Sequence, residues 1–404
     1  MDKIMCLMQY DCIIGDEHKI WYIASWLSYL MEIDRATGEM KVLLSLKGKG
    51  HYRALIKDGN RLLLVPSGKG DLWTYNIVDG KTASCPVPDS VFREGENWSA
   101  QYIRLGNFVY FSWASPVIVR YDLSECQWKV LTEWKKLLPK DCVCKQWFWN
   151  APFFYDGFLY FQVETSRMIL KLNPNNNNFD MVSLQIPEGI VSIDHMLFSN
   201  GELWLECRNA DGAASIYCCR DCSTFQCERI YDFDMEAVGN GHIRFLWLME
   251  KVGDKLLLLP KCHDKAYLLN VENQTVDVMN QFPAVSCDRM RTYGEGRFKF
   301  NYYRGFRLRN SFLIMHSWTH QLIEVDCDEC NVKEIPITLS DNMFDRIIKE
   351  ELEVGAIHYE GFLGLEDLLY FVLSKGGMGD MEESSRGVDI PCNGNIYSAI
   401  FLDL

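Results

Sequence analysis

The chain has 404 residues, of which 48% are apolar and 13% aromatic, so it can bury a large hydrophobic core. Its formal charge of −14 argues against nucleic acid and anionic membranes as partners, because both bind basic surfaces. No stretch reaches the roughly 18 apolar residues of a membrane-spanning helix, and the N-terminus lacks the pattern of an export signal. These properties predict a cytoplasmic protein.

Sixteen cysteines fit this prediction as reduced thiols that pack like small apolar residues. A structural zinc site is the alternative. Cys327 and Cys330 have the spacing of a zinc knuckle, and Cys218, Cys219 and Cys222 are close together in the sequence. Neither group supplies four ligands, so free thiols are the preferred interpretation.

From the N-terminus onward, one pattern recurs eight times. It consists of a turn and a four-residue apolar run, with an Asp or Asn 14 or 15 residues after the start of the run in six repeats. The runs are residues 20–23, 62–65, 108–111, 158–161, 203–206, 256–259, 312–315 and 368–371. Self-similarity at this period indicates the blades of a propeller or the turns of a solenoid.

Each repeat divides into four short strands. Residues 117–121 and 128–131 alternate between apolar and polar side chains on either side of Asp122. An Asx side chain favours a tight turn there, because it can accept a hydrogen bond from its own backbone two residues on. Another short strand precedes each apolar run, as at residues 52–56. We therefore expect each unit to be a four-stranded antiparallel meander.

Four-stranded units at this period resemble the blades of a β-propeller, and the resemblance covers essentially the whole chain. It rests on architecture, because a consistent Trp-Asp ending and the paired glycines of kelch repeats are both lacking. The resemblance implies one all-β domain over residues 1–404 with eight blades, or with seven if repeat seven or eight is distorted. Residues 3–8 are expected to complete the blade that ends at residues 395–404. One helix is predicted within residues 340–352, capped by Ser340.

In propellers, the connections between blades and those between second and third strands emerge on one face around the central channel, where ligands usually bind. The positions 11 and 9 residues before each apolar run should begin the inner strands at this face. They are mostly polar, aromatic or charged: Gln9, Asp11, His51, Arg53, Asn97, Ser99, Trp147, Trp149, Ser192, Asp194, Asn301, Tyr303, Ile357 and Tyr359, with His242 and Arg244 as counterparts in the sixth repeat. Polar groups of mixed type are what orient a ligand in a pocket.

Histidine and tryptophan are concentrated on the same face. Four of the eight histidines fall within or beside these positions, each in a different repeat: His51, His195, His242 and His358. Half of the twelve tryptophans project there as well: Trp26, Trp113 and Trp318 in recurring Ser-Trp pairs, with Trp98, Trp147 and Trp149. These rings either cover the blade edges or stack on sugar rings and hold a partner peptide.

Two functions from different classes follow. The first is a non-catalytic propeller whose aromatic face binds a protein, a peptide or a glycan. The alternative is an intracellular lyase or related enzyme acting on an acidic sugar, with a divalent metal held by the four histidines and Gln9. Arg53 and Arg244 would then bind the carboxylate. The abundance of tryptophan over carboxylates, together with the lack of a catalytic motif, favours the first.

Overall fold

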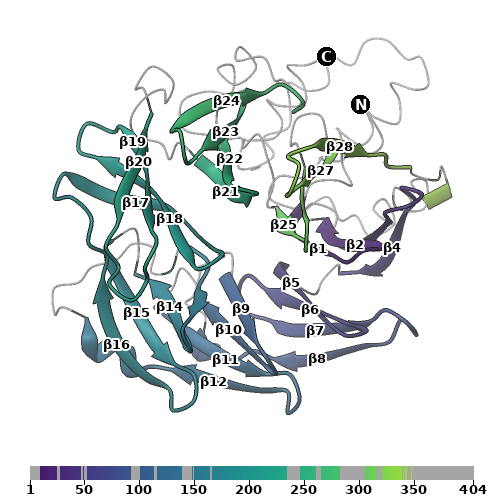
Figure 1. Cartoon of the computed structure of the whole chain (residues 1–404). Helices are drawn as coiled ribbons and strands as arrows, with labels where there is room; N and C mark the ends of the chain where they lie inside the picture. The colour runs from purple at the N-terminus through teal and green to yellow at the C-terminus, as the bar shows by residue number, and fades with distance from the viewer. Residues whose placement is uncertain are drawn as a thin grey trace, which may run out of the picture.

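The computed structural model describes residues 10–24, 28–46, 49, 52–91, 101–112, 116–138, 148, 150–163, 166–233, 246–260, 265–282, 305–315, 321–338, 340, 342–343 and 347. Within these ranges the chain forms seven four-stranded antiparallel sheets, which are arranged in a ring (Figure 1). The protein is a β-propeller, and the described residues form seven blades. The eighth unit predicted around residues 368–371, and the closure of one blade by the two termini, lie outside the described residues.

The strands of each blade pair in sequence order. Blade 1 consists of β1 (Tyr10–Gly15), β2 (Lys19–Ala24), β3 (Tyr29–Asp34) and β4 (Met40–Ser45), and blade 2 of β5 (Tyr52–Asp58), β6 (Arg61–Pro66), β7 (Asp71–Asn76) and β8 (Thr82–Pro86). Blade 3 consists of β9 (Gln101–Leu105), β10 (Phe108–Ser112), β11 (Ile118–Asp122) and β12 (Gln127–Leu131). Blade 4 consists of β13 (Phe153–Tyr155), β14 (Phe158–Gln162), β15 (Met168–Asn173) and β16 (Asn178–Ser183).

Blades 5 to 7 follow the same plan. Blade 5 consists of β17 (Ile190–Ser199), β18 (Glu202–Asn209), β19 (Ala214–Cys219) and β20 (Glu228–Asp232). Blade 6 consists of β21 (Leu246–Val252), β22 (Lys255–Pro260), β23 (Ala266–Asn270) and β24 (Thr275–Met279). Blade 7 consists of β25 (Phe306–Arg307), β26 (Ser311–Met315), β27 (Leu322–Asp326) and β28 (Val332–Ile335). Two short 3-10 helices, η1 (Asp89–Val91) and η2 (Glu133–Leu137), follow β8 and β12. In Figure 1 the first strands β1, β5, β9 and β21 lie toward the centre of the ring.

The second strand of each blade is buried on both faces, which explains the four-residue apolar runs. In β2, Ile20 and Tyr22 pack toward blade 7, whereas Trp21 and Ile23 pack toward blade 2. Successive side chains of a strand point to opposite faces, so a strand between two neighbours needs apolar residues at every position. The second strands of the other described blades divide their side chains in the same way.

The hydrophobic core of the described residues is divided into seven clusters, one between each pair of neighbouring blades. One of these joins blade 7 to blade 1 and includes Met31, Leu313 and Leu322. Because blade 7 packs directly on blade 1, the ring closes with seven blades. The preferred count of eight is therefore corrected to the seven-bladed alternative. An apolar run in the sequence shows that a segment resembles a blade strand, but it does not show that the segment enters the ring.

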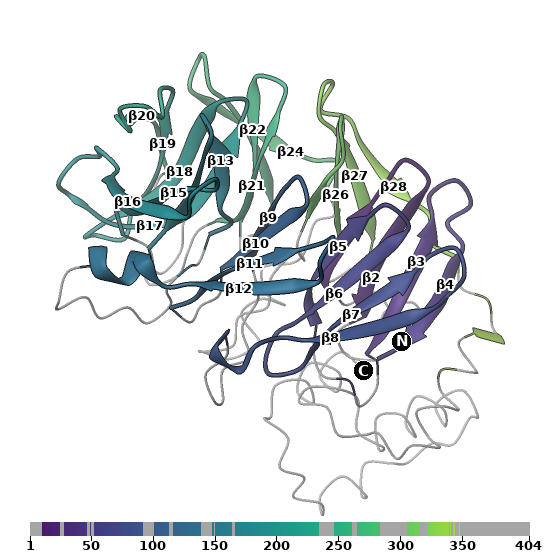
Figure 2. The same cartoon turned by 90° about the horizontal axis from the view of Figure 1, so that it is seen from below.

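The Asp or Asn that follows six of the runs at a nearly constant spacing marks the turn between the third and fourth strands. Asp34 Oδ1 accepts the backbone N–H groups of Ala36 and Thr37 at 2.9 and 3.0 Å. Equivalent bonds are made by Asn76, Asp122, Asn173, Asn270 and Asp326. The predicted Asx turns are confirmed. In Figure 2 the tips of these hairpins, together with those between first and second strands, point to one side of the ring.

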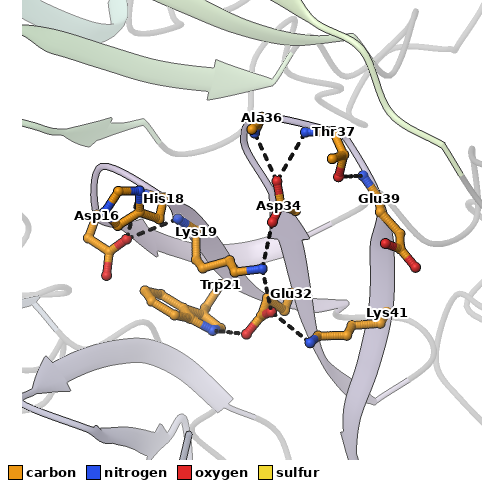
Figure 3. Close-up of polar contacts among 10 residues, drawn as sticks. All are labelled: Asp16, His18, Lys19, Trp21, Glu32, Asp34, Ala36, Thr37, Glu39 and Lys41. Atoms are coloured by element: carbon orange, nitrogen blue, oxygen red, sulfur yellow. Dashed lines mark hydrogen bonds and ion pairs between the residues drawn. The ribbon is translucent and has the colours of Figure 1, made fainter.

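Blade 1 contains a buried carboxylate within a network of donors (Figure 3). Glu32 accepts a hydrogen bond from Trp21 Nε1 at 2.9 Å and lies 3.0 Å from Lys41 Nζ. Lys19 Nζ lies 3.3 Å from Glu32 and donates to Asp34 at 2.7 Å. A charge is tolerated inside a sheet when it is paired and hydrogen-bonded, so this network lets blade 1 bury Glu32 among apolar neighbours.

The predicted helix after β28 begins as expected. Ser340 Oγ accepts the backbone N–H of Met343 at 3.2 Å, and Asn342, Met343 and Ile347 are helical. Met343 and Ile347 pack against the cluster between blades 7 and 1. The start of this helix therefore extends the core at the place where the ring closes.

The seam between blades 7 and 1 is also joined by charged side chains. Arg35 Nη2 lies 2.6 Å from Glu324 Oε1, and Lys333 Nζ lies 3.1 Å from Glu324 Oε2. Arg35 and Glu324 are 289 residues apart in the sequence. Both side chains are largely buried, so the pair is screened less than an exposed one. It fixes the first blade against the last.

Backbone pairing completes the seam. The N–H of Thr338 donates to Gly38 O at 2.8 Å, and the N–H of Met40 donates to Thr338 O at 3.0 Å. Gly38 has a φ of +72°, and a Cβ at this position would lie 1.9 Å from Pro336 O. Only glycine satisfies both the backbone angle and the close approach. Glycine at position 38 thus lets the turn between β3 and β4 pack closely against the segment that follows β28.

Gly38→Ala is expected to destabilise the protein more than Gly59→Ala. Both glycines have positive φ, but a Cβ at Gly59 has no atom within 4 Å. Gly59→Ala should cost about 1–2 kcal/mol for the left-handed backbone alone. Gly38→Ala should cost at least about 2 kcal/mol more, because the seam must separate to admit the methyl group. The unfolding free energy in urea measures both, and equal losses would contradict this account of the seam.

The ion pairs of Glu324 should make the unfolding free energy depend on pH in the acidic range. Burial raises the pKa of Glu324, but hydrogen bonds from Ser311, Lys333 and Arg35 outweigh burial and leave the pKa below its ordinary value. The folded state therefore binds this proton less tightly than the unfolded chain. The ionised Glu324 carboxylate therefore contributes its full stabilisation at pH values above its pKa in the unfolded chain, about 4.3. This stabilisation is lost as the pH falls through the lower pKa that Glu324 has in the folded protein.

Glu324→Gln removes this titration while keeping the size of the side chain. We expect the variant to be about 1–3 kcal/mol less stable than the wild type at pH 7. The difference should shrink as the pH is lowered toward 3. Urea unfolding at several pH values measures it, and a difference that stayed constant would show that Glu324 does not carry the effect.

Candidate functional site

Three of the predicted site residues lie in the described part of the chain: Arg53, Asp194 and His195. The others lie outside it: Gln9, Trp26, His51, Trp98, Trp113, Trp147, Trp149, His242, Arg244, Asn301, Tyr303, Trp318 and His358. The convergence of the four histidines and the aromatic face therefore stay predictions. The site below is built from the described residues at the same face of blades 4, 5 and 6.

The inner strands bulge where the sequence places the rim of the channel. In β5 the register moves from Tyr52 to Ala54 across the bulge, so Arg53 is the extra residue. In β17 the extra residue is Asp194. A bulge re-aims one side chain and is common beside functional sites. In β21 the bulge falls at Trp247, three residues beyond Arg244, so the register places Trp247 at the position equivalent to Arg53 and Asp194.

Asp194 holds an arginine at this rim. Arg208 Nη2 lies 2.9 Å from Asp194 Oδ2, and both Nε and Nη2 of Arg208 lie 3.3 Å from Ser192 Oγ. Asp194 is 2% exposed, whereas the Arg208 side chain is 22% exposed. Asp194 and Ser192 therefore hold the guanidinium by charge and by hydrogen bonds, while part of the side chain stays exposed. Its Nη1 donates no hydrogen bond within the described residues.

The neighbouring pair on the same two strands is His195 and Glu206, which lie opposite each other in the register. Glu206 is buried, and its Oε1 accepts the backbone N–H of Leu246 at 3.0 Å. Leu246 begins β21, the inner strand of the next blade. Glu206 therefore links blade 5 to blade 6 just below the rim, where an apolar residue occupies the equivalent place in other blades.

Two buried amides make the corresponding link to blade 4. Asn150 Nδ2 donates to Gln162 Oε1, and Asn150 Oδ1 accepts the N–H of Met196 at 3.3 Å. Gln162 Nε2 in turn donates to Ser166 O at 3.0 Å. Buried amides are stable only when their donors and acceptors are satisfied, so this chain of bonds fixes the entry to blade 4 against β17.

Sequence reasoning missed Arg208, Glu206, Asn150 and Gln162. Glu206 carries a visible signal, because it is the one charged residue within the seven described apolar runs. Arg208 lies five residues after the start of its run, in a strand whose period of two places it on the face of Glu206. No sequence signal identifies Asn150, since its partner Gln162 is in another strand and the pairing depends on the fold.

The described residues include no group of three or more His, Cys, Asp or Glu side chains arranged to hold a metal ion. Of the predicted metal ligands, only His195 falls within these residues. In the same part of the chain, no helix is both long enough and apolar enough to cross a membrane.

A hollow of about 360 Å³ lies on the opposite face, where the hairpins of blades 1 and 7 meet. Its walls include Glu17, Arg35, Glu324, Lys333 and Pro336. Both cations in its wall pair with Glu324, so they already contribute to the contact between blades 7 and 1. This hollow belongs to ring closure rather than to the rim of the channel.

No protein-family model matches the chain, and no curated protein matches its sequence. Among solved structures, PorZ, a surface component of the type-IX secretion system of Porphyromonas gingivalis, is 11% identical with a TM-score of 0.54. The match covers 82% of this chain and 38% of PorZ. A streptogramin B lyase is 11% identical with a TM-score of 0.50, over 83% of this chain and 95% of the lyase.

Virginiamycin B lyase from Staphylococcus aureus is 13% identical with a TM-score of 0.50, and the match covers 77% of this chain and 94% of the lyase. The chain shares the propeller fold with these proteins. Identities this low establish the fold alone, because one repeat scaffold hosts unrelated activities. The site must therefore be interpreted from its own residues.

Asp194→Ala is expected to destabilise the protein by about 1–3 kcal/mol, because it leaves Arg208 beside a buried cavity without its carboxylate. This loss of unfolding free energy is smaller than for a fully buried ion pair, because the Arg208 side chain is partly exposed and stays partly hydrated without Asp194. Asp180→Ala, on the exposed side of β16, is the control and should change stability by no more than about 0.5 kcal/mol. Urea unfolding compares the two, and similar losses would contradict the role assigned to Asp194.

Proposed function

We propose that the protein is a non-catalytic binding propeller that holds a protein, peptide or glycan ligand at the face where the inner strands begin. The observation that carries this proposal is Arg208. Its guanidinium is held by Asp194 and Ser192 and its side chain remains 22% exposed, while Nη1 donates no hydrogen bond to any residue of the described part of the chain. An arginine oriented in advance can bind a carboxylate or a carbonyl group without first losing side-chain entropy.

The surroundings of Arg208 support a preorganised surface. Glu206 and the pair Asn150–Gln162 join blade 5 to both of its neighbours beneath the rim. A binding site gains affinity when its supporting residues are already fixed before the ligand arrives. Val191, beside Ser192, is 62% exposed and adds an apolar contact at the same edge.

The aromatic part of the proposed surface is the set of tryptophans identified in the sequence, which would stack on sugar rings or pack on a peptide. We also propose a cytoplasmic location. The ten cysteines in the described residues are all free, as is usual for proteins kept in a reducing compartment.

Arg208→Lys tests the proposal, because it keeps the charge and removes the planar fork. On peptide and glycan arrays, the wild type should bind a defined set of probes, and Arg208→Lys should bind them at least about tenfold more weakly, or about 1.4 kcal/mol. Arg104→Lys is the matched control. Arg104 is also held by a carboxylate, Asp58 at 2.8 Å, but on the hairpin face.

The control should bind like the wild type, and both variants should keep the circular dichroism spectrum of the folded protein. Equal losses in the two variants, or a wild type that binds no probe, would contradict the proposed surface.

The alternative is a metal-dependent lyase acting on an acidic sugar, with His51, His195, His242 and His358 as ligands. Elemental analysis by inductively coupled plasma mass spectrometry separates it from the binding propeller. One transition metal per chain that is lost in His195→Ala would favour the lyase. On our proposal, the metal content of His195→Ala equals that of the wild type, at well below one ion per chain.

A further inference from the structure

The last hairpin of blade 5 contains three cysteines that the proposed function does not use. β19 ends at Cys219, β20 begins at Glu228, and Cys222 and Cys227 lie in the turn between them. Cys219 and Cys222 have the spacing C-x-x-C. All three thiols are free, and they pack at the interface between blades 4 and 5.

The sulfurs of two of these cysteines are close together. Cys219 Sγ and Cys222 Sγ are 4.0 Å apart, whereas a disulfide bond requires about 2.0 Å. Cys219 and Cys222 are fully buried, while Cys227 is partly exposed.

The backbone of the turn is held in place by blade 4. The N–H of Gln185 donates to Phe225 O at 2.8 Å, and the N–H of Cys227 donates to Gln185 O at 3.0 Å. These two bonds form a bridge beside the cysteines. The sulfurs are therefore brought together by the folded ring and not by the turn sequence alone.

Hydrogen bonds from Cys222 and Cys227 lower the pKa of the Cys219 thiol. The thiolate is the form that attacks a disulfide, and Cys219 is the member of this group that can accept the proton of a neighbouring thiol as that thiol attacks. The other two thiols, which donate these bonds, have raised pKa values.

We propose that Cys219 and Cys222 are a modification site, which forms a reversible disulfide by exchange with a small disulfide such as oxidised glutathione, with Cys227 as the entry thiol. Cys227 passes its proton to Cys219 and attacks one sulfur of the oxidant, releasing one thiolate of the small molecule. Cys219 then attacks Cys227 and releases the second. Cys222 attacks Cys219 and returns Cys227 as a thiolate. The two released thiolates take up the protons of Cys219 and Cys222, so two cysteines are oxidised and one small disulfide is reduced to two thiols.

The chain contains a matched control. Cys327 and Cys330 have the same spacing at the corresponding hairpin of blade 7. Burial raises the pKa of Cys327 to about 12 and also raises that of Cys330. Within the described residues, no hydrogen bond joins these two sulfurs, in contrast to Cys219 and Cys222. We therefore expect this pair to stay reduced under conditions that oxidise Cys219 and Cys222.

The experiment exposes the folded protein to oxidised glutathione, alkylates the remaining thiols with iodoacetamide and maps the cysteines by mass spectrometry. The peptides that contain Cys219 and Cys222 should be joined and two hydrogen atoms lighter, and reduced glutathione should reverse the change. Cys327 and Cys330 should be alkylated. Cys227→Ser should slow the disulfide at least tenfold, and Cys222→Ser should stop at a disulfide between Cys219 and Cys227.

Circular dichroism during the exposure shows that the ring stays folded. The proposal is overturned if Cys219 and Cys222 remain alkylated while the protein is folded, or if Cys327 and Cys330 oxidise at the same rate. An unchanged rate in Cys227→Ser would refute its role as the entry thiol.

Discussion

Packing between neighbouring blades is the constraint on which this structure depends. Each blade is a single sheet with apolar side chains on both faces, so it has no core of its own and becomes stable only between two others. Twist in each sheet allows the blades to radiate from an axis, and the ring is complete when the last sheet covers the first. The charged pair of Arg35 and Glu324 and the close approach at Gly38 add specificity to this last contact.

The same constraint shapes the rim of the channel. Two of the buried polar side chains described there bridge neighbouring blades, because Glu206 accepts a hydrogen bond from Leu246 and Asn150 accepts one from Met196. Each bridge satisfies a group that would otherwise be costly to bury. Arg208 differs, because its partners Asp194 and Ser192 lie within its own blade and its side chain is 22% exposed. Arg208 is therefore suited to contact a ligand, whereas Glu206 and Asn150 stabilise the contacts between blades.

Sequence periodicity predicted the strands, their pairing and the Asx turns, because these depend on local alternation and on side chains that bond to nearby backbone. It left the number of blades between eight, the preferred count, and seven, the count that the structure shows. Closure depends on contact between Met31 and Leu313, and nothing local to either residue reveals its partner. The bulges of β5 and β17 fall on Arg53 and Asp194, two of the positions selected from the spacing of the runs. The link from Asn150 to Gln162 could not be foreseen, since Asn150 lies before β13 and the folded chain brings it to the end of β14.

The seam has a consequence for synthesis of the protein. Ribosomes make blade 1 first, but the residues that cover one of its apolar faces, Leu313 and Leu322, are made about 290 residues later. During translation, the face formed by Ile20, Tyr22 and Met31 is therefore exposed to water and to other nascent chains. Contacts this distant in the sequence form slowly, because a long loop must close first. The growing chain is prone to aggregate through this face, and chaperones that bind apolar strands would protect it until blade 7 emerges.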